Sequence, residues 1–146
     1  MTRREARKQA FIIIFEQAVQ EKTTAEAFED AIEARDFVVK PFIEGLVAGR
    51  ESNSDEIDDV IKGQLKGWSL SRISKISLAI LRLAVYEILF DPTIPVSVSI
   101  NEAVELAKEF GSNEDASYIN GVLSAVEKTA EYKKDDAKEE DEESEV

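Results

Sequence analysis

Histidine and cysteine are both absent from this chain of 146 residues. Their absence removes the usual general base, thiolate nucleophile and zinc ligands, and with them the commonest forms of side-chain catalysis. Carboxylates can still bind a hard cation, but the sequence has no calcium loop of the D-x-D-x-D-G type and no GxxxxGK phosphate loop. We therefore expect a protein that is not an enzyme and that carries no metal and no cofactor.

Long apolar runs are also missing, and there is no internal repeat. No stretch approaches the roughly eighteen apolar residues that cross a membrane. The apolar residues 10–15 are too few for the core of a signal peptide, and Glu16 and Gln17 follow them directly. These observations, with the lack of cysteine, predict a cytoplasmic protein without membrane attachment.

The charge of the chain is strongly acidic and unevenly distributed. Asp and Glu number 31 against 18 Lys and Arg, which gives a net charge of −13. Residues 131–146 alone hold nine acidic residues and three lysines, with no apolar periodicity. Such a segment buries too little apolar surface to offset its chain entropy. We therefore predict one domain over residues 1–130, large enough for its own core, and a disordered acidic tail over residues 131–146.

Apolar residues recur at helical spacing along the rest of the chain, and strand patterns are almost absent. The pairs Thr2/Glu5, Thr23/Glu26 and Asn53/Glu56 match the capping box that opens a helix. Residues 70–90 leave little polar surface, so this helix should be buried on most sides and form the centre of the fold. The pattern predicts an all-α fold of about seven helices, over residues 3–21, 23–34, 36–50, 53–67, 70–90, from the loop 91–95 to Gly111, and 115–129, with 51–55 as a linker.

Four cations open the first predicted helix: Arg3, Arg4, Arg7 and Lys8. The first and third, and the second and fourth, are spaced i, i+4, so each pair shares a side of the helix. Cations at a helix N-terminus oppose the macrodipole, and an external anion such as an RNA phosphate would offset that cost. The alternative interpretation is a solvated helix end that is balanced by Glu5, Glu16 or the acidic tail.

Three further blocks follow at close spacings: ILRLAVYEI at residues 80–88, IPVSVSINEAVELAKEFG at 94–111 and SYINGVL at 117–123. With the basic opening RREARKQAF at 3–11, they resemble the NusB family of transcription antitermination factors over roughly residues 3–128. The resemblance implies two small helical bundles packed together. It also implies binding of boxA-type single-stranded RNA in nascent ribosomal-RNA transcripts together with ribosomal protein NusE. With other Nus factors, that complex would hold RNA polymerase in a termination-resistant state.

The resemblance also implies which residues bind RNA. The four cations of the opening would contact phosphates, and Phe110, Glu114 and Tyr118 would contact bases. Aromatic rings suit this role because single-stranded bases stack on them. The alternative interpretation makes both aromatics core residues that close the last two helices. One departure is Ser117, which stands where the family often has lysine and so removes a possible phosphate contact.

For NusE, the resemblance points to Phe15, Ser71 and Ser77. The family often has an acidic and then a basic residue where this chain has Ser77 and Leu78, so a charge-assisted contact to a basic partner would be lost. Some family members associate with themselves, which leaves a homodimer open.

Other motif residues are interpreted as structural. We expect Arg82, within the hub helix, to pair with a carboxylate such as Glu87 or Glu102, because a lone buried guanidinium is costly. We expect Asn101 and Glu102 to lie at a helix start. The remaining expectations are close helix packing at Asn120 and Gly121 and a core position for Trp68.

A second interpretation is a protein with the same fold but without the RNA-binding function. The acidic balance and the departures at Ser117 and Ser77 favour a helical protein–protein adaptor with weak or no RNA binding. NusB-like domains also occur fused to ribosomal-RNA methyltransferases, but no residues remain here to build a methyl-donor domain.

Overall fold

The computed structural model describes the backbone of residues 1–66 and 69–145 and the side chains of residues 1–66 and 69–129. Within these ranges the chain forms seven α-helices and one 3-10 turn, with no strand. The all-α prediction is confirmed. The elements in chain order are α1 (Arg3–Gln20), α2 (Thr24–Arg35), α3 (Pro41–Ser52), α4 (Ser54–Lys62), η1 (Leu70–Arg72), α5 (Lys75–Phe90), α6 (Val96–Phe110) and α7 (Asn113–Glu145).

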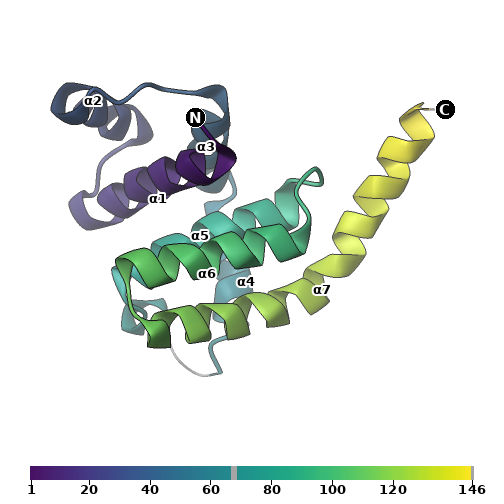
Figure 1. Cartoon of the computed structure of the whole chain (residues 1–146). Coiled ribbons are helices and arrows are strands. Elements are labelled where there is room, and N and C mark those ends of the chain that lie inside the picture. Colours follow the sequence, from purple (N-terminus) through teal and green to yellow (C-terminus); the bar gives the residue numbers. More distant parts are fainter. Residues whose placement is uncertain (67–68, 146) are drawn as a thin grey trace.

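The helices form two small bundles that share α5. Helices α1 to α3 lie together on one side of it, and α4, α6 and α7 lie on the other (Figure 1). Helix α5 packs against α1, α3, α4, α6 and α7. Its sequence KISLAILRLAVYEILF explains this position, because apolar side chains point in nearly every direction around the helix. The prediction of a buried hub helix is confirmed.

Two of the three predicted N-terminal helix caps form. The Oγ1 atoms of Thr2 and Thr23 accept hydrogen bonds from the backbone N–H groups of Glu5 and Glu26, each at 3.1 Å. The third prediction is wrong, because the amide of Asn53 donates to the carbonyl of Gly49 at 2.8 Å and does not cap α4. The predicted linker is also absent, since α3 continues to Ser52 and α4 begins at Ser54.

Other boundaries shift for local reasons. Asp36 was expected within the third helix, but it ends α2 in a left-handed conformation with φ of 50°. The third helix begins at Pro41, whose fixed φ suits the first helical position. Helix α4 ends at Lys62 with Gly63 as its C-cap, and the predicted end at Gly67 lies outside the described residues, as does Trp68.

The last helix is longer than the sequence pattern predicts. The backbone of α7 remains helical to Glu145, beyond the predicted end near Thr129, and its last turns extend away from both bundles (Figure 1). Residues 131–145 contain no Gly or Pro and are rich in Glu and Lys, so a helix already formed over the preceding turns can propagate through them. The side chains of 130–146 lie outside the described residues, so no contact there tests the predicted disorder of residues 131–146.

None of the described helices combines the length and the apolar character that crossing a membrane requires.

Candidate nucleic-acid interface

The four cations at the start of α1 lie in different surroundings, because α1 is covered by α5 on one side and approached by α3 and α6 on others. One of the four is buried in the core. Two form ion pairs with α6 at the surface, and one lies on an aromatic ring of α3. The spacing of the four cations suggested one shared role in phosphate binding, but the structure places them in three different environments.

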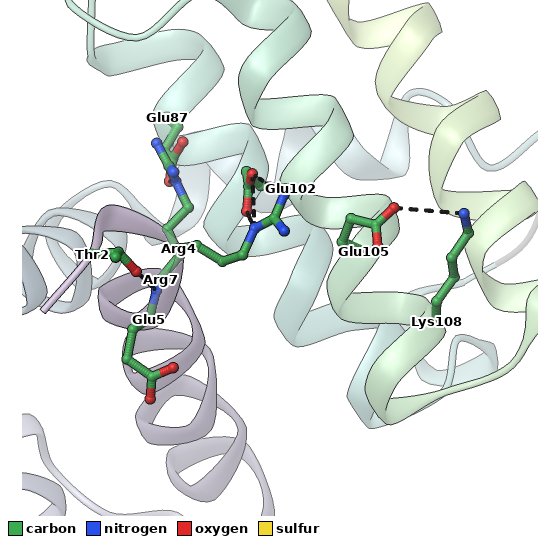
Figure 2. Close-up of polar contacts among 8 residues, drawn as sticks. All are labelled: Thr2, Arg4, Glu5, Arg7, Glu87, Glu102, Glu105 and Lys108. Carbon is green, nitrogen blue, oxygen red and sulfur yellow. Dashed lines mark hydrogen bonds and ion pairs between the residues drawn. The ribbon is translucent and has the colours of Figure 1, made fainter.

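Arg7 is the buried member. Its Nε donates to Oε2 of Glu87 on α5 at 2.8 Å, and the hydroxyl of Ser99 on α6 donates to the other oxygen of Glu87 at 2.9 Å. Arg7 is 6% exposed and Glu87 is 1% exposed. Figure 2 shows the two side chains approaching each other between α1 and α5. The prediction that Arg7 contacts phosphate is wrong for this structure, since α5 covers that side of α1 and the guanidinium fastens the helices together.

Arg4 and Lys8 lie at the surface and pair with α6. The guanidinium of Arg4 donates from Nε at 3.1 Å and from its terminal nitrogen at 3.0 Å to the carboxylate of Glu102 (Figure 2). The Nζ of Lys8 lies 2.6 Å from Oε1 of Glu109. These hydrogen bonds raise the pKa of Arg4 and of Lys8 above their ordinary values. Exposed pairs of this kind are weak and screened by salt, so an external anion can replace the carboxylate.

Arg3 turns toward α3 instead. Its Cζ lies 4.2 Å from the centroid of the Phe42 ring, a cation–π distance. Among the residues whose side chains are described, no carboxylate forms an ion pair with it. Arg3 is therefore the cation of this group that an outside anion meets without displacing anything.

The alternative interpretation of the basic opening is partly correct. The protein's own carboxylates do balance three of the cations, but these are Glu87, Glu102 and Glu109. Glu5 accepts a hydrogen bond from a glutamine, and Glu16 pairs with Arg35 at 2.9 Å. The sequence held one usable signal: Glu102 and Glu109 share one face of their helix, as Arg4 and Lys8 share one side of α1, although the two spacings differ, at seven and four residues.

Phe110 lies at the edge of this group and belongs to the core as well. Its ring centroid is 5.0 Å from that of Phe11, and the ring is half-buried. The Nζ of Lys8 lies 5.6 Å from the same ring. The structure thus brings one predicted base contact beside one predicted phosphate contact.

Glu114 and Tyr118 are exposed and lie one turn apart on α7. Tyr118 is 42% exposed, so it is not a core aromatic. It lies between two hollows of about 470 and 210 Å³, the first lined also by Gln64, Leu65 and Gly121. The predicted close packing at Gly121 is absent, since a Cβ atom added there would meet nothing within 4 Å.

The residues predicted to bind a partner protein differ in accessibility. Phe15 is half-buried and stacks on Phe11, with centroids 6.1 Å apart. Ser71 is exposed in η1, and its Oγ lies 2.8 Å from that of Ser69. Ser77 is only 2% exposed in the first turn of α5, so the structure contradicts a direct partner contact there.

Arg82 has a different partner from either of those predicted. Its guanidinium makes two hydrogen bonds to Asp58 of α4, at 2.9 and 3.1 Å. Arg50 lies nearby, and burial followed by repulsion from Arg82 lowers the pKa of Arg50. The expected helix-start role of Asn101 and Glu102 is also wrong, because α6 begins at Val96 and both residues lie inside it.

The described side chains include no group of three or more Asp or Glu residues placed to hold a metal ion. The arrangement offers ionic and stacking contacts along the start of α1, the end of α6 and the start of α7.

Comparisons with known proteins identify the family of the chain. The NusB family model matches residues 4–128. The transcription antitermination protein NusB of Bacillus licheniformis is 41% identical over 131 residues, which cover 90% of this chain and 100% of the relative. The NusB of Bacillus subtilis is also 41% identical, over 90% of this chain and 98% of its own length.

Solved structures show the same fold. T. maritima NusB matches with a TM-score of 0.81 and 31% identity, covering 93% of this chain and 98% of its own. A crystal structure of the antitermination factors NusB and NusE in complex with dsRNA matches with a TM-score of 0.77 and 27% identity, covering 88% of this chain and 99% of the matched chain. This chain belongs to the NusB family of transcription antitermination proteins.

Proposed function

We propose that this protein binds boxA-type single-stranded RNA of nascent ribosomal-RNA transcripts together with ribosomal protein NusE. The complex, with other Nus factors, then acts on RNA polymerase by assembly. Membership of a family whose curated relatives are antitermination proteins supports this, as does the matched structure of NusB and NusE with RNA. That structure contains double-stranded RNA, so the strandedness of the ligand is part of the test.

The observation that carries the proposal is a cationic rim, defined as Arg3, Arg4 and Lys8, on a protein with a net charge of −13. All three side chains reach the surface near the start of α1. Screening over about 8–10 Å at physiological salt lets such a local group act independently of distant negative charge. Phosphates would replace Glu102 and Glu109 on the rim.

Base contacts would come from Phe110 beside the rim and from Glu114 and Tyr118 on α7. Phe110 already lies beside Lys8 at the end of α6, and α7 begins three residues later. Tyr118 offers an exposed ring, and stacking on such a ring contributes about 1–3 kcal/mol per base.

The rim predicts modest affinity for the chain alone. Three phosphate contacts on a single strand give a log–log salt slope of about −2. Between 50 and 200 mM salt this is a loss of about 20-fold. A partner that adds surface is therefore needed for tight recognition, and NusE would supply it through the region of Phe15 and Ser71.

Fluorescence anisotropy with a boxA oligonucleotide, single-stranded and annealed to its complement, with and without NusE, tests the proposal. Replacing Arg3, Arg4 and Lys8 together with Ala, while Arg7 is kept, should make the salt slope much less steep. The matched control replaces three exposed cations away from the rim and from Tyr118: Lys62, Lys75 and Lys128. A slope that the rim substitutions leave unchanged would contradict the proposal, as would equal affinity for an unrelated sequence.

A second candidate is a protein-binding adaptor of the same fold. The pairing of Arg4 and Lys8 with Glu102 and Glu109 favours it, because the rim is stable without any RNA. NusE binding with no boxA affinity in the same assay would establish this function. Sedimentation of the free chain would show whether a homodimer competes.

A further inference from the structure

A small pocket opens between the first turn of α1 and the start of α3. Its volume is about 270 Å³. Two cations, Arg3 and Lys40, line it, and no acidic residue does. The remaining lining residues are Met1, Thr2, Ala6, Pro41 and Phe42. The protein is strongly acidic overall, so a pocket whose only charged side chains are positive is a distinct feature of its surface.

Neither cation is neutralised by a carboxylate that the structure describes. Within the described side chains, no ion pair forms at Lys40 or at Arg3. Arg4 and Lys8, only a turn away on α1, each have a carboxylate partner. The charge of the pocket is therefore available to an outside anion at no cost in broken pairs.

The aromatic floor of the pocket orients one of these cations. The Cζ of Arg3 lies 4.2 Å from the centroid of the Phe42 ring, a contact that limits its movement, and a guanidinium can donate two parallel hydrogen bonds to a phosphate. Lys40 is exposed and lies immediately before α3, where its side chain makes no capping bond. The nearest acids by sequence are Glu5, which binds Gln9, and Asp36 and Glu44, each four residues from Lys40, and none of them lines the pocket.

We propose that this pocket binds one backbone phosphate of the RNA strand, held between Arg3 and Lys40. The inference rests on the proposed function and extends the RNA-binding surface from α1 and α6 to α3. The ligand chemistry is a phosphodiester, because Arg3 directly precedes Arg4 and a strand held by the rim passes beside the pocket. Lys40 thereby becomes an RNA contact that the basic opening of the sequence does not include.

The test compares Lys40→Gln with Lys62→Gln, an equal change of charge at an exposed position in the last turn of α4. Both positions are exposed, so both variants should fold. Loss of one of the two cations that hold this phosphate should make the salt slope less steep by up to about 0.7, and at 50 mM salt the affinity should fall up to about three-fold more than at 200 mM. Lys62→Gln should change neither quantity beyond the error of the measurement.

A scan of the oligonucleotide with single neutral methylphosphonates then locates the phosphate. At one position the neutral linkage should weaken wild type, and Lys40→Gln should add no further loss there. If Lys40→Gln matches Lys62→Gln while Arg4→Ala and Lys8→Ala weaken binding, the pocket proposal is overturned and the proposed function stands. If wild type with NusE binds no boxA RNA, both are overturned.

A titration with inorganic phosphate tests whether the pocket binds free phosphate instead of a phosphodiester of RNA. Amide chemical shifts around Lys40 are followed during a phosphate titration of wild type and Lys40→Gln. Shifts that depend on Lys40, combined with unchanged RNA affinity in the variant, would assign the pocket to free phosphate and overturn the proposal.

Discussion

Arg7 and Arg4 lie three residues apart on α1, and each pairs with a glutamate, yet the two pairs do different work. The side chains of Arg7 and Glu87 are 7% and 1% exposed, whereas those of Arg4 and Glu102 are 66% and 14% exposed. The first pair is buried and therefore costly to break, because a single charge left in the core has neither water nor a counter-ion to stabilise it. The second pair exchanges freely with solvent and ions. Burial therefore makes the pair of Arg7 and Glu87 structural, whereas exposure leaves Arg4 able to bind an external anion.

A third pair lies between these two. Arg82 and Asp58 are 18% and 20% exposed and join α5 to α4. The three pairs thus form a series in which the chemistry is constant and access to water changes. The loss of stability on breaking each pair should therefore increase with its burial. An effect on RNA affinity should appear only at the exposed pair of Arg4 and Glu102.

The largest expected effect is at the buried pair. Arg7→Ala leaves the carboxylate of Glu87 in the core with only the hydroxyl of Ser99 beside it. We expect a loss of about 3–5 kcal/mol in the free energy of unfolding, measured by urea titration. Arg4→Ala serves as the matched control and should leave the midpoint unchanged. A small loss for Arg7→Ala would remove the distinction drawn between the two pairs.

A double substitution sharpens this prediction. If the penalty comes from an unpaired charge, Arg7→Met combined with Glu87→Leu should recover much of the stability, because apolar side chains of similar volume often replace a buried pair without loss. If the double variant is as unstable as Arg7→Ala, lost packing between α1 and α5 is the cause and the series by burial fails.

The intermediate pair should give an intermediate effect. Asp58→Asn removes the charge that faces Arg82 and leaves it close to Arg50, whose pKa burial already lowers. We expect a loss of about 1–3 kcal/mol in the free energy of unfolding. Asp59→Asn, an exposed neighbour on the same helix, is the control. A loss at Asp58 as large as that at Arg7 would show that exposure does not rank these pairs.

Residue patterns alone predict much of this fold. The capping threonines Thr2 and Thr23 and the apolar helix α5 follow directly from local sequence, because capping bonds and helical spacing involve residues within a few positions of each other. The boundaries at Asp36 and Asn53 do not follow, since either residue can end one helix or begin the next. Which it does depends on the packing of α3 against α1 and α5.

The site is less predictable, and Arg7 shows why. Spacing at i, i+4 places Arg3 and Arg7 on one side of α1, but it does not reveal which neighbouring helix covers that side. The partner of Arg7 is 80 residues away in the chain. Lys40 was missed for a related reason, because only the packing of α1 on α3 brings it beside Arg3.

The smallest expected effect is at the exposed pairs, and it concerns RNA rather than stability. Replacing Glu102 and Glu109 with Gln keeps the shape of α6 and frees Arg4 and Lys8 from their carboxylates. Unfolding should change little, because exposed pairs contribute little. RNA affinity at low salt should rise about two- to five-fold per substitution, since phosphates no longer compete with a carboxylate. Glu29→Gln on α2 removes an equal charge away from the rim and should raise affinity less. Unchanged affinity in the double variant would mean that these carboxylates do not compete with RNA, and the exposed pairs would then be structural like the buried one.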